Sequence, residues 1–240
     1  MTKLNISVGI LTWNAHNTLE NTLESYQMSG LLDMVNDVCI FAQEGKDADY
    51  KIAAKYGTDI ILSPTNVGIG LGLSTLAQAA ETDNILLLEN DWVVLPEFYD
   101  IVYSELAKGL DMINKNKADV VKYRSRRAPG DPLYTLQFAN REFDSPKHLL
   151  ECVHWREYPE MDFPEYIGKD IETGLYYAKA KYANQTNNPC LYKKDFYTSN
   201  ISPFAGEGNQ LEGKIDGWWQ EQDFTVAHGE GLFTHYRLDR

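Results

Sequence analysis

The N-terminal part of the chain alternates short apolar runs with segments whose apolar residues recur at helical spacing. Runs typical of buried strands occupy residues 4–11, 38–42, 59–62 and 85–88. Helical spacing, as in Leu19, Leu23 and Tyr26, predicts helices at residues 18–26, 48–56 and 71–80. Strands alternating with helices in this way predict an α/β fold with a mostly parallel central sheet flanked by helices.

The later part of the chain has a weaker pattern. It predicts a helix at residues 97–116, strands at 118–123 and 188–192, and a helix at 216–224. Between them, residues 125–188 are irregular and rich in proline and aromatic side chains, and we assign this region to the second substrate. No linker composition interrupts the chain, so we expect one domain over residues 1–240, with functional halves at 1–100 and 118–240.

Polar segments follow four of the predicted strands, at residues 12–14, 43–45, 66–70 and 89–91. Ligands of parallel α/β sheets bind at the carboxyl ends of the strands. We therefore expect these four segments to converge on one binding site. The segment at 66–70 contains Asn66, Gly68 and Gly70, which permit a tight loop whose backbone approaches ribose or phosphate closely.

Two carboxylates, Glu89 and Asp91, end the apolar run at residues 85–88. In an extended chain they point to the same side while Asn90 points away. Two oxygen ligands on one side suit Mg²⁺ or Mn²⁺, and such a cation suits a diphosphate. A strand that simply ends in polar residues has the same local pattern, so the interpretation depends on the other three segments.

Composition excludes some classes of function. The 240 residues carry a formal net charge of −13, which argues against a nucleic-acid partner because such proteins present a basic face. No run approaches the ~20 apolar residues of a transmembrane segment, and the three cysteines have no disulfide-like or metal-like spacing. We expect a soluble, cytoplasmic protein, with peripheral attachment to a membrane left open.

The first hundred residues resemble the nucleotide-sugar-binding half of glycosyltransferases with the GT-A fold, most closely the inverting family 2 type. Thr12-Trp13-Asn14 resembles the turn after the family's opening strand. Glu89-Asn90-Asp91 resembles its metal-binding Asp-x-Asp motif, with Glu89 as the departure. Glu44 resembles the acidic residue that holds the base of the nucleotide, although Gln43 is an alternative.

This resemblance implies a UDP-, GDP- or dTDP-sugar donor, a hydroxyl of a glycan or glycoconjugate as acceptor, inversion, and Mn²⁺ or Mg²⁺ as cofactor. The implied metal ligands are Asp91, Glu89 and a C-terminal histidine, His235. The implied nucleotide-sugar residues are Thr12, Trp13, Asn14, Glu44, Asn66, Gly68, Glu89, Asn90 and Arg124. Arg124, with Arg126 and Arg127, suits a phosphate or an acidic acceptor, and a solvated loop is the alternative.

An inverting transferase needs a carboxylate to take the proton of the acceptor hydroxyl. The segment Glu221-Gln222-Asp223-Phe224 resembles the family's base segment, which makes Glu221 the first candidate, Asp223 the second and Asp216 the third. These acids equally fit a helix N-terminus, where negative charge is favourable. Trp218 and Trp219 point in different directions, so we expect one to stack on an acceptor sugar and the other to fill the core.

Two other functions fit parts of the pattern. A noncatalytic carbohydrate-binding protein would use the 15 tyrosines and 5 tryptophans as sugar platforms, but it would not need Glu89, Asp91 and a late carboxylate together. A sugar-1-phosphate nucleotidyltransferase shares a related core. Its opening loop is usually glycine-rich and basic, whereas residues 12–17 contain neither glycine nor lysine.

Overall fold

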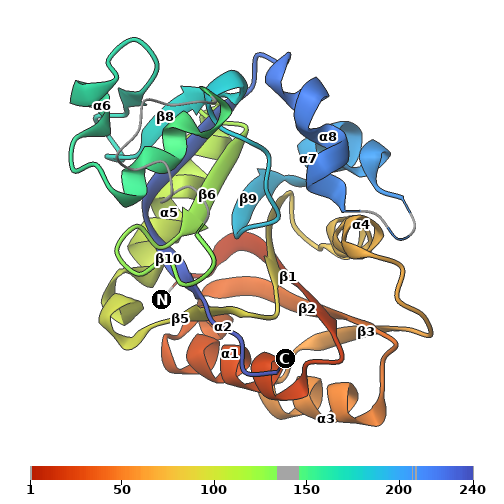
Figure 1. Ribbon diagram of the computed structural model, residues 1–240. Coiled ribbons are helices and arrows are strands. Elements are labelled where there is room, and N and C mark those ends of the chain that lie inside the picture. The colour runs from red at the N-terminus through yellow and green to blue at the C-terminus, as the bar shows by residue number, and fades with distance from the viewer. Residues whose placement is uncertain (1, 134–145, 207, 209, 240) are drawn as a thin grey trace.

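The computed structural model describes residues 2–133, 146–206, 208 and 210–239 (Figure 1). Its strands are β1 (Leu4–Trp13), β2 (Val35–Gln43), β3 (Asp59–Ser63), β4 (Asn84–Glu89), β5 (Trp92–Val94), β6 (Val120–Arg124), β7 (Gly168–Lys169), β8 (Tyr176–Lys179), β9 (Cys190–Lys193) and β10 (Thr225–His235). Within the described residues they form a ten-stranded sheet in the order β3-β2-β1-β4-β9-β6-β10-β8-β7, and β5 pairs with β10.

Helices cover both faces of this sheet. The α-helices are α1 (His16–Met28), α2 (Leu31–Met34), α3 (Asp47–Tyr56), α4 (Ile69–Ala79), α5 (Val102–Asn114), α6 (Pro159–Asp162), α7 (Lys194–Asn200) and α8 (Leu211–Gln220). Short 3₁₀ helices are η1 (Pro96–Ile101), η3 (Pro146–His154), η4 (Ala180–Tyr182) and η5 (Ser202–Phe204). One core includes apolar side chains of α1, α3 and α5, and a second includes those of α4, α7 and α8. Figure 1 shows α1 and α3 at the bottom and α7 and α8 at the upper right.

The predicted α/β fold is confirmed. Strands β3, β2, β1 and β4 are parallel neighbours, and antiparallel pairing begins where β9 lies between β4 and β6. Part of the irregular region expected at 125–188, residues 134–145, lies outside the described residues.

The later helices differ from their predictions. The segment predicted as one helix is divided into η1 and α5. Helix α8 begins five residues before the predicted 216–224 and ends at Gln220, because its buried residues Leu211, Ile215 and Trp219 recur every four positions along one face. The predicted segment therefore includes only the second half of this helix.

The segment 226–237, which has no predicted structure, forms most of β10. This strand pairs in parallel with β6, and its register shifts between His228 and Phe233. Gly231 lies in the shifted stretch with φ +68°, and a Cβ there would lie 2.2 Å from the carbonyl oxygen of Arg124. Glycine thus permits a bulge, and beyond it the strand continues to His235, beside β5.

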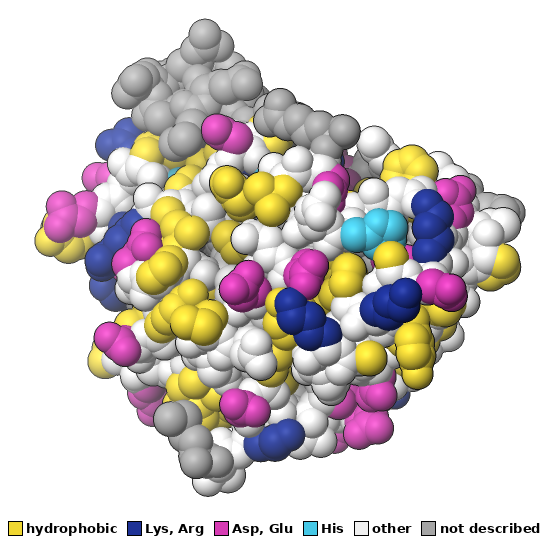
Figure 2. Space-filling model, turned by 90° about the horizontal axis from the view of Figure 1, so that it is seen from below, with side chains coloured by type: hydrophobic (Ala, Val, Ile, Leu, Met, Phe, Trp, Pro, Cys, Tyr) yellow, Lys and Arg dark blue, Asp and Glu magenta, His cyan; other side chains and the backbone are white. Residues whose placement is uncertain are grey.

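The surface seen in Figure 2 carries acidic and basic side chains in mixed order, with hydrophobic side chains between them. On this face the net negative charge is not concentrated in a single acidic field. None of the described helices combines the length and apolarity needed to cross a membrane.

Candidate functional site

Two adjoining cavities lie at the carboxyl ends of β1 and β4. The first, of about 700 Å³, is lined by residues that include Thr12, Trp13, Asn14, Asn66, Gly68 and Asn90. The second, of about 620 Å³, is lined by residues that include Asp91, Lys122, Glu151, Glu212, His228 and His235. Both cavities share Ile69, Glu89, Gln210 and Arg237 as a common wall. A ligand with two dissimilar parts can therefore extend from one cavity into the other.

The turn after β1 is held by Glu44. Its carboxylate accepts hydrogen bonds from Trp13 Nε1 at 2.9 Å and Asn14 Nδ2 at 2.8 Å. These two hydrogen bonds lower the pKa of Glu44, and the bond from Trp13 has the larger effect. Asn14 adopts φ 48°, a left-handed conformation that asparagine tolerates. The structure thus brings Trp13, Asn14 and Glu44 together, and the half-exposed Trp13 ring lies at the wall of the first cavity.

The loop after β3 is held by Gln43. Its side-chain oxygen accepts hydrogen bonds from the amides of Val67 at 2.9 Å and Gly68 at 3.0 Å. Asn66 Oδ1 also accepts from Gly68 N at 2.9 Å, and Gly68 has φ +88°. The sequence offers Glu44, or alternatively Gln43, as the residue that holds the base of the nucleotide. In the structure the two have different roles: Gln43 holds this loop and Glu44 holds the turn after β1.

The segment after β4 differs from its prediction in one respect. Glu89 and Asp91 both line the second cavity, as an extended chain requires, but Asn90 lines the first cavity with Glu89. The chain turns at Asn90 and Asp91 instead of continuing as a strand, so strict alternation of side chains ends at Glu89. The expectation that Asn90 faces away from the site is wrong.

Asp91 is only 1% exposed and lies among cationic side chains. His235 Nε2 lies 3.1 Å from its Oδ2, and Arg237 donates to the same oxygen from Nε at 3.0 Å and from Nη2. Burial raises the pKa of Asp91, but the hydrogen bonds and charges of His235 and then Arg237 outweigh it, so the pKa is lowered. The pKa of Glu89 is raised to about 7 by burial and then by the charges of Asp91 and Glu212.

The residues after β10 hold Arg237 against this site. Tyr236 N donates to the carbonyl oxygen of Asp91 at 2.7 Å. Two residues after Arg237, the Asp239 carboxylate accepts from Thr18 N at 2.8 Å and from Asn17 Nδ2 at 2.7 Å, both in the first turn of α1. Figure 1 shows this end of the chain lying close to α1. The sequence interpretation missed Arg237, although its position two residues after His235 is a usable signal.

Arg124 lines the second cavity, but its guanidinium is engaged by the protein. It donates to the carbonyl oxygens of Pro129 at 2.9 Å, Gly130 at 2.8 Å and Pro132 at 2.7 Å, and it lies over the Trp92 ring. Burial lowers its pKa to about 10. In this arrangement Arg124 holds a loop that forms part of the cavity wall.

The predicted base candidates lie in the second half of α8 or just after it. Asp216 pairs with Lys147 at 2.6 Å, Glu221 follows the last turn of the helix, and the 91% exposed carboxylate of Asp223 pairs with Lys179 at 2.9 Å. None of the three is among the described residues that line the two cavities. The helix presents its first turn to the site, and that turn contains Glu212.

Trp218 and Trp219, in the same helix, also lie outside the described lining of both cavities. Trp219 is 1% exposed and donates from Nε1 to the carbonyl oxygen of Ala183 at 2.7 Å. Trp218 packs against Phe204, with ring centroids 4.9 Å apart. Both tryptophans thus contribute to packing in this structure.

Glu212 is a carboxylate that the sequence interpretation missed. One of its oxygens, Oε1, accepts hydrogen bonds from Thr186 Oγ1 at 2.9 Å and from Asn187 N at 2.6 Å. Its charge contributes to the raised pKa of Glu89, which indicates that the two carboxylates are close enough to interact. Glu212 lines the same cavity as Glu89 and Asp91 of the segment after β4.

The side chains around Asp91 are of the right chemical types to bind a divalent metal, but they are not arranged as a metal site. Asp91 and Glu89 supply carboxylate oxygens, and His235 supplies an imidazole nitrogen. Across the described ranges, however, no group of three or more His, Cys, Asp or Glu side chains is placed to hold a metal ion. The expected ligand set is not assembled, and the guanidinium of Arg237 provides positive charge at Asp91.

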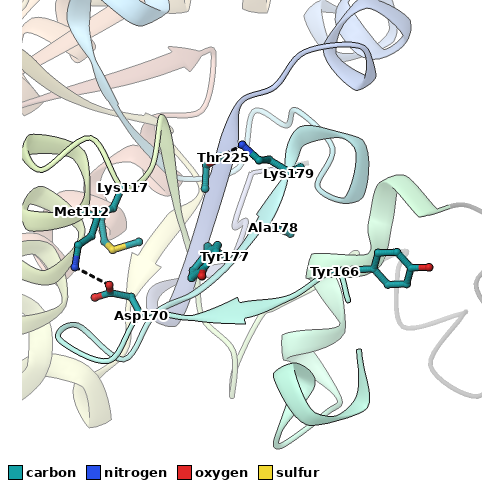
Figure 3. A pocket seen from close by; sticks show the side chains of 8 residues that line it. All are labelled: Met112, Lys117, Tyr166, Asp170, Tyr177, Ala178, Lys179 and Thr225. Atoms are coloured by element: carbon teal, nitrogen blue, oxygen red, sulfur yellow. Dashed lines mark hydrogen bonds and ion pairs between the residues drawn. The ribbon is translucent and has the colours of Figure 1, made fainter. Parts of the chain in front are cut away.

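A third cavity, of about 380 Å³, lies beside β8 and β10 (Figure 3). Figure 3 shows Lys117 directed at Asp170 and Lys179 directed at Thr225, with Tyr166 apart from them. The Lys117–Asp170 pair measures 2.7 Å, and its hydrogen bond is the main cause that lowers the pKa of Asp170 to about 2. Because these charges are paired within the protein, we place the functional site in the first two cavities.

Comparison with known proteins supports this fold. No family model and no curated sequence matches the chain. Residues 1–349 of TarS from S. aureus superpose with a TM-score of 0.59 at 13% identity, covering 98% of this chain and 60% of that one. Glucosyl-3-phosphoglycerate synthase from Mycobacterium tuberculosis, in complex with Mn²⁺, UDP-glucose and phosphoglyceric acid, gives 0.56 at 15% identity, covering 98% and 72%.

A mycobacterial protein gives a TM-score of 0.56 at 16% identity, covering 98% of this chain and 67% of that one. The chain therefore spans between 60% and 72% of these three proteins. At such low identity the likeness shows the fold alone. The chain has the GT-A fold that the sequence resemblance implies.

Proposed function

We propose that this chain is a glycosyltransferase that moves a sugar from a nucleoside diphosphate sugar to a hydroxyl of a glycan or glycoconjugate. The observation that carries the proposal is the common wall of the two cavities, with Glu89 and Arg237 at the carboxyl end of the parallel strands. A diphosphate at this wall would have its nucleoside in the first cavity and its sugar in the second.

Two side chains of the first cavity suit a nucleoside. The exposed Trp13 ring offers a face for stacking, and Glu44 fixes its orientation. Asn90 has a buried Nδ2 without a partner among the described residues, and this atom can donate to the ligand. The Mn²⁺ and UDP-glucose of the M. tuberculosis synthase complex agree with a nucleotide sugar as donor.

Glu212 is our candidate for the base, in place of Glu221, Asp223 and Asp216. In the proposed step the acceptor hydroxyl oxygen forms a bond to the anomeric carbon while the bond from that carbon to the diphosphate breaks. The diphosphate leaves with the electron pair, and the hydroxyl proton goes to the carboxylate of Glu212. Arg237, in the common wall of the two cavities, would face the position where the diphosphate gains negative charge. Inversion remains a prediction from the family resemblance.

Nucleotide binding is the direct test. UDP, GDP and dTDP are each added to the protein with Mn²⁺ or with EDTA, and the melting temperature is measured. At about 100 times its Kd, one nucleotide would stabilise the fold by about 2.7 kcal/mol, a rise in Tm of roughly 5–10 °C for a chain of this size. If no nucleotide shifts Tm under either condition, the proposal is wrong.

The proposed metal dependence has its own test, because Arg237 and a cation would compete for Asp91. If Arg237 left Asp91, then Asp91, Glu89 and His235 would be the residues to hold a divalent ion, which would supply Lewis-acid stabilisation of the departing diphosphate. A charge-assisted hydrogen bond contributes ~1.5–3 kcal/mol. We therefore expect Arg237→Gln to bind Mn²⁺ about tenfold more tightly than the parent in calorimetric titrations.

Arg156→Gln is the matched control, since Arg156 forms an exposed ion pair with Asp162 at 3.5 Å. It should bind Mn²⁺ as the parent does. Equal Mn²⁺ affinity of the parent and Arg237→Gln, or no binding by either, would contradict the proposed competition at Asp91.

A further inference from the structure

We propose that the inner end of the second cavity binds the hydroxyl groups of an uncharged sugar. This inference rests on the proposed function and names the class of sugar that the site selects. Lys122 on β6, Glu151 and His154 on η3, and His228 on β10 form the inner end. These side chains come from three elements of the second half of the chain.

Among the described residues, three buried polar atoms at this inner end lack partners: His228 Nε2, Glu151 Oε2 and His154 Nδ1. His228 is 1% exposed and Glu151 is 8% exposed. His228 Nδ1 lies 2.9 Å from the carbonyl oxygen of Gly229, which can only accept a hydrogen bond. The proton of the neutral ring is therefore on Nδ1, and Nε2 is an acceptor. Within the described part of the chain, neither His228 Nε2 nor Glu151 Oε2 has a hydrogen-bond partner. Buried acceptors without donors are costly, so both atoms favour a ligand that donates hydrogen bonds.

An anionic ligand does not meet this requirement. Carboxylate and phosphate oxygens are acceptors, and at these two positions they would face further acceptors. The positive charge of Lys122 is already matched, because its Nζ forms a buried ion pair with Glu151 and donates to Asn184 at 2.9 Å. No charge at the inner end is therefore left over to bind an acidic sugar.

A cationic ligand is disfavoured by the same surroundings. Burial, followed by the charges of Arg124 and Lys122, lowers the pKa of His154 to about 3. Burial lowers the pKa of His228 well below its ordinary value, with His154, Lys122 and Arg126 adding to the effect. A site that keeps two imidazoles neutral also opposes an ammonium group. A hydroxyl group both donates and accepts while carrying no charge, and it satisfies these atoms.

The uncharged sugar can belong to the donor or to the acceptor, because the second cavity joins the first at Glu89 and Arg237. Calorimetric titrations with UDP-glucose, UDP-N-acetylglucosamine, GDP-mannose and UDP-glucuronic acid, each compared with UDP or GDP, test the donor. Titrations with methyl glucoside, glucuronic acid and glucosamine in the presence of the nucleotide test the acceptor.

We expect at least one uncharged sugar to bind about tenfold more tightly than its acidic counterpart in one of the two series. His228→Phe keeps a ring of similar size and removes Nε2, and Glu151→Gln keeps the side-chain shape and removes the charge. Each variant should weaken binding of the uncharged sugar by about tenfold, while the affinity for the nucleotide alone stays within about twofold.

Glu172→Gln is the matched control because its exposed carboxylate pairs with Lys117 away from this cavity. Nucleotide binding by each variant also reports that it is folded. If uncharged, acidic and amino sugars bind alike, or if both variants bind the uncharged sugar as the parent does, the inference is overturned while the proposed function stands. If no nucleotide binds to the parent, the proposed function itself fails.

Discussion

Replacing Asp91 with asparagine is expected to lower turnover of a nucleotide sugar by about 10²–10³-fold, the range typical for loss of a positioned electrostatic contact. Asp91 is almost fully buried and accepts two hydrogen bonds from Arg237 at the wall between the cavities. Asparagine preserves the shape but removes the negative charge, so Arg237 and His235 lose the partner that holds them. The measurement is release of UDP or GDP from the nucleotide sugar that stabilises the parent.

Asp170→Asn is the appropriate control for this variant. Asp170 also pairs with a cation, Lys117, but it lines the third cavity, beside β8 and β10. It should retain turnover within about twofold even if its Tm falls. Parental turnover by Asp91→Asn would show that the contact between Asp91 and Arg237 has no part in the reaction.

Replacing Glu212 with glutamine is expected to reduce transfer to an acceptor by about 10²–10⁴-fold, the usual contribution of a general base. Affinity for the nucleotide should not change, because Glu212 lines the second cavity and is absent from the described lining of the first. Glutamine can still accept hydrogen bonds from Thr186 and Asn187, so the local structure should persist. Transfer is measured in single turnovers with the acceptor saturating.

Glu221→Gln and Asp223→Asn, measured in parallel, separate the two assignments of the base. A large loss in either variant with full activity in Glu212→Gln would favour the assignment made from the sequence resemblance. Glu172→Gln controls for the chemical change at an exposed glutamate. Background hydrolysis does not settle the base, since water and the acceptor need not share it.

Elements with a strong local pattern were predictable. The four apolar runs of residues 4–88 all form strands, since buried parallel strands have continuous apolar sequence. The turn at Thr12–Asn14 and the loop at Asn66–Gly68 line one cavity with Glu89, because parallel strands place their carboxyl ends at the same edge. The helix containing Trp218 was predicted at 216–224 but spans Leu211–Gln220. Several sets of apolar residues in this segment could form the buried face of a helix, and the choice among them depends on what the helix packs against.

The sequence by itself determined the α/β fold and the polar segments that end its first strands, because these depend on neighbouring residues and on a general rule of topology. Only the tertiary structure decided which charges meet at the site. Arg237 reaches Asp91 across 146 positions of the chain, and Lys122 reaches Glu151 across 29. Such contacts form when β10 and η3 pack beside distant strands, and the local pattern of the chain contains no record of that packing.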